Sequence, residues 1–232
     1  SMVLLHLMRS GQRCLDASLE VRARKTLAGM TRQVTCKRKP DDTLIDRVFE
    51  WMTGKLWLYD HVGKVDPKKV FEVFDYARRR YGVQYFVLDS LMKCGLRNDD
   101  LDGQAEFLNN LANYCAAHPV HIFLVAHPRK DADDNGEPGT QSIKGAGAIT
   151  DQAHNLIVYH RNKTKEKALE KLGQGESLTR DEEAAQKKAD SYLTIEKQRE
   201  GDGDYARAAL SFDIESQQIR QQGEAFEPMV PY

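Results

Sequence analysis

Three polar residues lie at the ends of short apolar runs. If these runs are strands of a parallel α/β sheet, the residues lie where such sheets bind their ligands. Glu20 follows LDASL, Asp89 closes YFVLD and His127 closes IFLVAH. Ligands lie at the carboxyl ends of parallel strands, so these side chains are expected to converge. Asp89 could hold Mg²⁺ through a water, Glu20 could polarise an attacking water, and His127 could donate a hydrogen bond to a terminal phosphate. The pattern predicts a nucleotide-hydrolysing site.

Each of these residues also has an ordinary structural explanation. A strand-end aspartate such as Asp89 can cap the segment that follows it. Glu20 can be a first-turn glutamate favoured by the dipole of the next helix. His127 can be a polar residue at the point where a strand leaves the core. Taken one at a time, the residues leave both interpretations open.

The elements that must position these residues alternate between strands and helices through the first two thirds of the chain, as in a mostly parallel sheet covered by helices. Three later strands follow without helices between them and predict antiparallel edge strands. The sequence therefore predicts an α/β fold. The expected strands cover residues 13–18, 55–59, 84–88, 120–126, 155–160, 192–197, 206–212 and 217–221, and the expected helices cover 3–9, 21–37, 41–53, a segment opening at 66–67, and 104–117.

Residues 163–190 are highly charged, favour helix and are interrupted by glycine at 173–175. This pattern predicts a projecting helical hairpin. The expected domain organisation is one domain over residues 2–222 and a C-terminal tail over residues 223–232.

Bulk composition restricts the possible partners. A chain of 232 residues with 41% hydrophobic and 30% charged residues suits one globular domain. The net charge of −1 means that any nucleic-acid binding must use local basic patches. No apolar run approaches the roughly 18 residues that span a bilayer, so no membrane is expected. The four cysteines form no CxxC pair, which disfavours zinc and suits reduced thiols.

Basic residues cluster in the two loops that follow Asp89 and His127. Arg97 lies in the first loop, and Arg129, Lys130 and Lys144 lie in the second. Such loops could contact the phosphates of single-stranded DNA if they face a central channel. The second loop also carries four acidic residues between 131 and 137, which weakens this interpretation.

Two further motifs could serve a subunit interface. Gly145 and Gly147 lie in a turn whose amides could face a ligand or a neighbouring subunit. Lys197 and Arg199 occur in EKQREGDGD, at the end of a late strand. Arg199 could reach a phosphate on an adjacent subunit as an arginine finger, or the two could be a solvated basic pair.

The order and spacing of five segments resemble the DnaB-type replicative helicase family, which includes phage primase–helicases and the mitochondrial helicase Twinkle. The segments are LHLMRSGQRCLDASLE at residues 5–20, QYFVLDSL at 84–91, VHIFLVAHPRK at 120–130, IKGAGAITDQAHNLIVYHRN at 143–162 and IEKQREGDG at 195–203. The resemblance covers almost the whole chain, roughly residues 3–219, and implies a RecA-like motor domain.

The resemblance also implies roles for the candidate residues. Glu20 looks like the catalytic base, and Asp89 is similar to the Mg²⁺-linked aspartate of the Walker B strand. His127 matches the γ-phosphate sensor position. Arg199 looks like the arginine finger, with Lys197 as its companion.

Further expectations follow from the family. The loops after Asp89 and His127 match DNA-binding loops, and Gly145, Gly147 and Asp151 are expected to line the nucleotide. ATP and Mg²⁺ are the implied cofactors. Family members form hexamers that translocate on single-stranded DNA, usually 5′ to 3′, so the implied partners are DNA, further copies and a primase domain or protein. The implied location is the cytoplasm of a bacterial or phage-infected cell.

One departure from the family matters. The sequence contains no GxxxxGK[ST] phosphate-binding loop, and Lys144 with its glycines does not replace it because no Ser or Thr follows the lysine. We therefore expect a motor domain that lacks its N-terminal part, is inactive alone and is monomeric or poorly assembled. Alternatives are a RecA-like recombinase, a plasmid-type hexameric helicase, or a non-catalytic DNA-binding or ring-assembly module.

Overall fold

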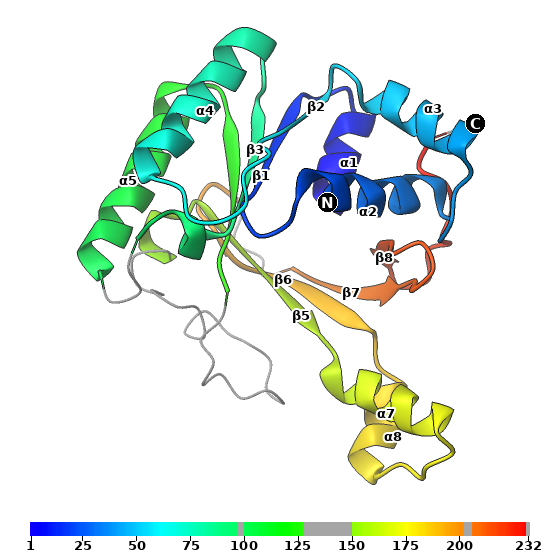
Figure 1. Cartoon of the computed structure of the whole chain (residues 1–232). Coiled ribbons are helices and arrows are strands. Elements are labelled where there is room, and N and C mark those ends of the chain that lie inside the picture. Colours follow the sequence, from blue (N-terminus) through cyan, green and yellow to red (C-terminus); the bar gives the residue numbers. More distant parts are fainter. Residues whose placement is uncertain (97–99, 128–149, 202–205, 231–232) are drawn as a thin grey trace.

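The computed structural model describes residues 1–96, 100–127, 150–201 and 206–230. Figure 1 shows a parallel sheet covered by helices on both faces. Below it runs a long antiparallel ribbon that ends in a helical hairpin.

The parallel sheet has the strand order β2-β1-β3-β4. Its members are β1 (Cys14–Ser18), β2 (Leu56–Leu58), β3 (Tyr85–Asp89) and β4 (His121–Val125), and all three neighbouring pairs are parallel. This confirms the predicted α/β fold.

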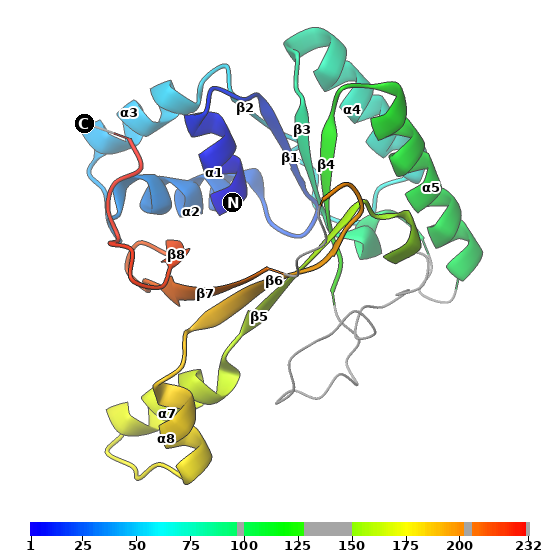
Figure 2. The ribbon, with the colours of Figure 1, turned by 180° about the vertical axis from the view of Figure 1, so that it is seen from behind.

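Helices cover the two faces of this sheet in sequence order. α1 (Met2–Arg9), α2 (Ala23–Thr35) and α3 (Asp42–Met52) lie on one face, and α4 (Pro67–Tyr81) and α5 (Leu101–Ala117) lie on the other, as Figures 1 and 2 show from opposite sides. A short 3-10 helix, η1 (Leu91–Lys93), follows β3. Local signals start three of these helices, because the carboxylates of Asp41, Asp66 and Asp100 accept hydrogen bonds from first-turn amides.

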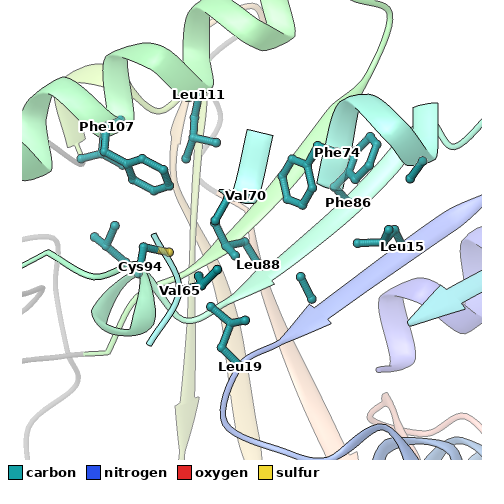
Figure 3. Close-up of a cluster of buried hydrophobic side chains, with 14 of the residues drawn as sticks. Leu15, Leu19, Val65, Val70, Phe74, Phe86, Leu88, Cys94, Phe107 and Leu111 are labelled. Carbon is teal, nitrogen blue, oxygen red and sulfur yellow. The ribbon is translucent and has the colours of Figure 1, made fainter. Parts of the chain in front are cut away.

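A separate apolar core fills each side of the sheet. Figure 3 shows the core beneath α4 and α5, where the rings of Phe74 and Phe86 lie 4.5 Å apart and neither side chain is exposed. The core beneath α1, α2 and α3 contains Cys14 of β1. Leu15 belongs to the first core and Cys14 to the second, because successive side chains of a strand point to opposite faces.

The late strands are antiparallel, as predicted, and in the described residues they form a sheet of their own. β5 (Asn155–Arg161), β6 (Ser191–Gln198), β7 (Arg207–Phe212) and β8 (Ile219–Gln221) follow one another in sequence and in space. The β5–β6 connection carries α7 (Lys163–Gly173) and α8 (Arg180–Gln186), which project away from the body (Figure 1).

The end of the chain packs against α2. Met229 is only 1% exposed, and its amide donates to the Val34 carbonyl over 2.9 Å. The Gln218 side chain donates to the carbonyls of Gln33 and Glu227. The boundary at residue 222 stays a prediction, although residues beyond it contribute to the second core.

Candidate functional site

Three neighbouring strands end in register at one edge of the parallel sheet. Ser18 of β1 lies opposite Asp89 of β3, which lies opposite Val125 of β4. Glu20 and His127 each follow two residues beyond their strands, so all three candidates leave the sheet at the same edge. The structure therefore brings together the three residues that the sequence singled out.

Glu20 is held by a buried hydroxyl and faces an imidazole. The Ser90 hydroxyl donates to Glu20 Oε1 over 2.8 Å, and Nε2 of His127 lies 3.8 Å from the same oxygen. Ser90 is fully buried, whereas the Glu20 side chain is 34% exposed. A carboxylate oriented in this way remains accessible to water and can accept a proton from it.

Backbone hydrogen bonds fix the loop that carries Glu20. The amide of Leu19 donates to the Asp89 carbonyl over 2.7 Å, and the amide of Gly63 donates to the Leu19 carbonyl over 2.9 Å. Gly63 has a φ of 120°, a conformation that favours glycine. The loop is thus anchored to β3 on one side and to the segment after β2 on the other.

Asp89 lies in an environment that suits a cation. Burial raises its pKa, the nearby Glu20 carboxylate raises it further, and His127 lowers it. Crowded carboxylates are the ligands that Mg²⁺ prefers, and a divalent cation would relieve their repulsion. Within the described ranges no three side chains form a complete metal cage. A cation here would take its remaining oxygens from water or phosphate, which fits the usual coordination of Mg²⁺.

Asp16 is a site residue that the sequence reasoning missed. Its register partner is Val87, so it lies on the same face of the sheet as Asp89. Asp16 is only 7% exposed, and burial raises its pKa to about 6, with a smaller upward contribution from Asp89. The available signal was a carboxylate in the middle of the buried strand CLDAS.

The N-terminal end of α1 lies near this same group of carboxylates, because Ser1, the residue before the helix, is within electrostatic reach of Asp16 and Asp89. Unpaired amides at a helix N-terminus favour anions, so the α1 end adds positive potential to this edge of the sheet.

Lys197 and Arg199 lie at the end of β6 and contact the segment before β5. The Lys197 ammonium donates to the Thr150 carbonyl, and Nη2 of Arg199 donates to the Asp151 carbonyl over 2.7 Å. The Arg199 amide also donates to the His154 carbonyl over 2.9 Å. The two basic residues therefore hold the helical residues 150–152 against the end of β6, and Asp151 lies beside them.

Six of the predicted binding residues lie outside the described residues. They are Arg97, Arg129, Lys130, Lys144, Gly145 and Gly147.

The sequence was compared with known proteins. No protein-family model matches it. The Twinkle homolog protein, chloroplastic/mitochondrial, of Arabidopsis thaliana is 25% identical over 123 residues, which are 47% of this chain and 17% of that protein. This match supports the resemblance of the chain to the DnaB/Twinkle-type helicase family. This chain thus spans less than a fifth of the Twinkle homolog.

Solved structures share the fold. A DnaB-like replicative helicase, described together with its interactions with primase, aligns over 93% of this chain and 52% of its own with a TM-score of 0.68 and 11% identity. A KaiC-like protein of Pyrococcus horikoshii aligns over 94% of this chain and 78% of its own with a TM-score of 0.59 and 16% identity. This chain therefore shares the RecA-like fold of these structures. Among the described helices, none is both long and apolar enough to cross a membrane.

Proposed function

We propose that residues 2–222 are the larger part of a motor domain that hydrolyses ATP and translocates on single-stranded DNA during replication. The observation that carries this proposal is the convergence of Glu20, Ser90 and His127 beside Asp89 at the carboxyl edge of the parallel sheet. A surface carboxylate with only a structural role would not need a fully buried hydroxyl to orient it.

Each residue then has a defined task. Glu20 accepts the proton of the attacking water, and the Ser90 hydroxyl orients the accepting carboxylate. His127 donates a hydrogen bond to the terminal phosphate from its position beside Glu20. Asp89 would hold Mg²⁺, which would neutralise charge on the phosphates. ATP and Mg²⁺ are the proposed cofactors.

The topology supports a phosphate-binding loop upstream of α1 in the full-length protein. The connection from β1 through α2 and α3 leads to β2 on one side, whereas β3 connects through α5, on the opposite face, to β4 on the other side. Parallel connections keep one hand. A strand before α1, which lies on the face of α2 and α3, would therefore reach the outer edge of β4, one strand away from β3 and Asp89. Because the sequence has no GxxxxGK[ST], we propose that the 232-residue chain by itself does not hydrolyse ATP.

Arg199 belongs to the same proposal as a residue that acts on a neighbouring subunit. One of its N–H groups is used by the Asp151 carbonyl. The side chain is exposed, and a guanidinium has further donors to offer a phosphate. We propose a hexamer in the full-length protein, 5′ to 3′ translocation, and a primase domain or primase partner.

The test extends the chain upstream in its reading frame and measures ATP hydrolysis with and without single-stranded DNA. We expect DNA to stimulate hydrolysis and Glu20→Gln to abolish it while nucleotide still binds. Glu50→Gln, at an exposed glutamate of α3, is the matched control and should leave the rate unchanged. Absence of DNA-dependent hydrolysis across salt and nucleotide conditions would reject the motor proposal in favour of a non-catalytic DNA-binding module.

A further inference from the structure

The amino edge of the parallel sheet, where β1, β2 and β3 begin, is strongly basic. The C-terminal end of α4 reaches this edge at the top of Figure 1, away from the edge that carries Glu20. Residues 9–13, 50–55 and 75–84 lead into these strands and contain six basic and two acidic residues. Their net charge is thus +4, in a chain whose overall net charge is −1. Such a local excess of positive charge attracts polyanions.

Hydrogen bonds hold these three segments side by side. The Arg13 carbonyl accepts from the Gln84 amide over 3.1 Å, and the Lys55 carbonyl accepts from the Cys14 amide over 2.7 Å. Nη1 of Arg13 donates to the Tyr81 carbonyl over 2.8 Å. The basic residues therefore belong to one surface and not to separate loops.

Only part of this positive charge is neutralised. Asp75 forms ion pairs with two arginines of its own helix, at 2.7 Å from Arg78 and 2.8 Å from Arg79. In the part of the chain that the structure describes, three cations of this edge form no ion pair: Arg13, Lys55 and Arg80. The dipole of α4 favours basic residues at its C-terminal end, but Arg13 and Lys55 lie outside that helix. Helix stability therefore does not account for the whole basic surface.

Aromatic rings lie beside these cations, gathered around Tyr81. The Trp57 ring stacks on the Tyr81 ring at 5.0 Å, and the Tyr76 ring meets the Tyr81 ring edge-on at 5.7 Å. The Arg80 guanidinium lies 6.0 Å from the centre of the Tyr81 ring. Tyr76 is 60% exposed, so its ring gains little from burial and remains open to a ligand.

Cations beside exposed rings are the combination that binds a single nucleic-acid strand, because rings stack on bases while cations contact the backbone phosphates. We propose that this amino-edge surface binds single-stranded nucleic acid, with a base stacked on Tyr76 and phosphates against Arg13 and Arg80. A duplex fits less well, because its bases are already stacked on one another and offer no free face to a ring. The amino-edge surface comprises Arg13, Lys55, Trp57, Tyr76, Arg80 and Tyr81.

This contact is separate from the proposed motor site. It lies at the opposite end of the parallel strands from Glu20 and Asp89, and it requires neither nucleotide nor a second subunit. The loops that follow Asp89 and His127 leave the sheet at its carboxyl edge. A strand bound at the amino edge would therefore be held in addition to any strand that those loops contact.

The test titrates the 232-residue chain with an oligothymidylate of about 15 nucleotides, a length within the site sizes of single-strand binding proteins. The chain has two tryptophans, so in the Trp51→Phe variant the fluorescence reports Trp57 alone. A base that joins the stack of Trp57 and Tyr81 should quench this fluorescence, and the anisotropy of a labelled strand gives the Kd. An oligouridylate of the same length is the RNA arm, and the strand that binds more tightly identifies the ligand.

Variants separate stacking from charge. Tyr76→Ala should raise the Kd about tenfold, since one stacked base is lost, whereas Tyr76→Phe keeps the ring and should bind like wild type. Arg80→Gln should reduce the slope of log Kd against log salt concentration by about 0.7, the value for one phosphate contact on a single strand. The matched controls are Tyr159→Ala, at a 44% exposed tyrosine of β5, and Arg180→Gln, at an exposed arginine of α8, and both should bind like wild type.

A loop variant keeps this proposal distinct from the motor proposal. Arg129→Gln/Lys130→Gln removes two basic residues of the predicted DNA-binding loop, and quenching of Trp57 should survive it. Circular dichroism confirms that each variant is folded. A wild type that binds neither strand, an abasic strand that binds as tightly as oligothymidylate, normal binding by Tyr76→Ala, or quenching lost in the loop variant would overturn the proposal.

Discussion

The buried carboxylate of Asp16 makes the stability of this protein depend on pH in an unusual direction. Asp16 lies between Leu58 of β2 and Val87 of β3 and is 7% exposed. Burial raises its pKa from 3.8 to about 6. The folded state therefore binds this proton more tightly than the unfolded state. The contribution of Asp16 to the free energy of unfolding falls as pH rises from about 4 to about 6 and is constant above that.

The size of the effect follows from the shift. Two pKa units at 1.36 kcal/mol each give about 3 kcal/mol. Asp16→Asn removes the titration, so the stability of the variant minus that of wild type should increase by about 3 kcal/mol between pH 4 and pH 7. The cost of burying the new asparagine amide is the same at every pH, so it does not affect this change with pH. Urea unfolding at several pH values measures it, and the carbon shift of the Asp16 carboxyl in an NMR titration reports the pKa directly.

Asp213→Asn is a control whose effect on stability should change with pH in the opposite direction. The Ser216 hydroxyl and amide donate to Asp213 Oδ2 over 2.6 Å and 2.8 Å, and these bonds lower the pKa of that carboxyl. Its contribution is present above the unfolded pKa and is lost as pH falls, so Asp213→Asn should be most destabilising near neutral pH. If the Asp16→Asn difference stayed flat, or shrank as pH rose, the carboxylate would be solvated or ion-paired and our account of it would be wrong.

Three further outcomes are expected. In the upstream-extended protein, Ser90→Ala should lower the rate constant of hydrolysis about tenfold with little change in KM, because the Glu20 carboxylate loses its orienting hydroxyl. An unchanged rate constant would show that Ser90 has no role in hydrolysis. Arg199→Lys should reduce steady-state hydrolysis about a thousandfold, the range of an arginine finger, and should leave nucleotide affinity unchanged when titrated by fluorescence; a normal rate would limit Arg199 to its bond with the Asp151 carbonyl. Phe74→Ala should lower the free energy of unfolding by about 3–5 kcal/mol in urea titrations, because the side chain is fully buried against Phe86; a loss below 1 kcal/mol would show that the core closes around the cavity.

The sequence by itself determined the elements and the strand-end residues. Asp66 and Pro67 start α4 through contacts within one turn, and apolar periodicity marked the strands that end near Asp89 and His127. These signals depend on neighbours a few residues apart, which are visible in the sequence. The antiparallel character of the late strands was predicted on the same basis.

Only the tertiary structure decided which distant groups meet. The hydrogen bond from Ser90 to Glu20 spans 70 residues, and it requires β1 and β3 to be adjacent and in register. The burial of Asp16 depends on the helices that cover its face of the sheet, the face on which Cys14 packs into the core beneath α1, α2 and α3. The exposure of Leu169 depends on how α7 packs against α8. The local sequence pattern determines where a helix or strand forms. The strand register and the crossover connections determine which elements become neighbours. Those neighbours determine how deeply each side chain is buried, which charges surround it and which groups it can contact.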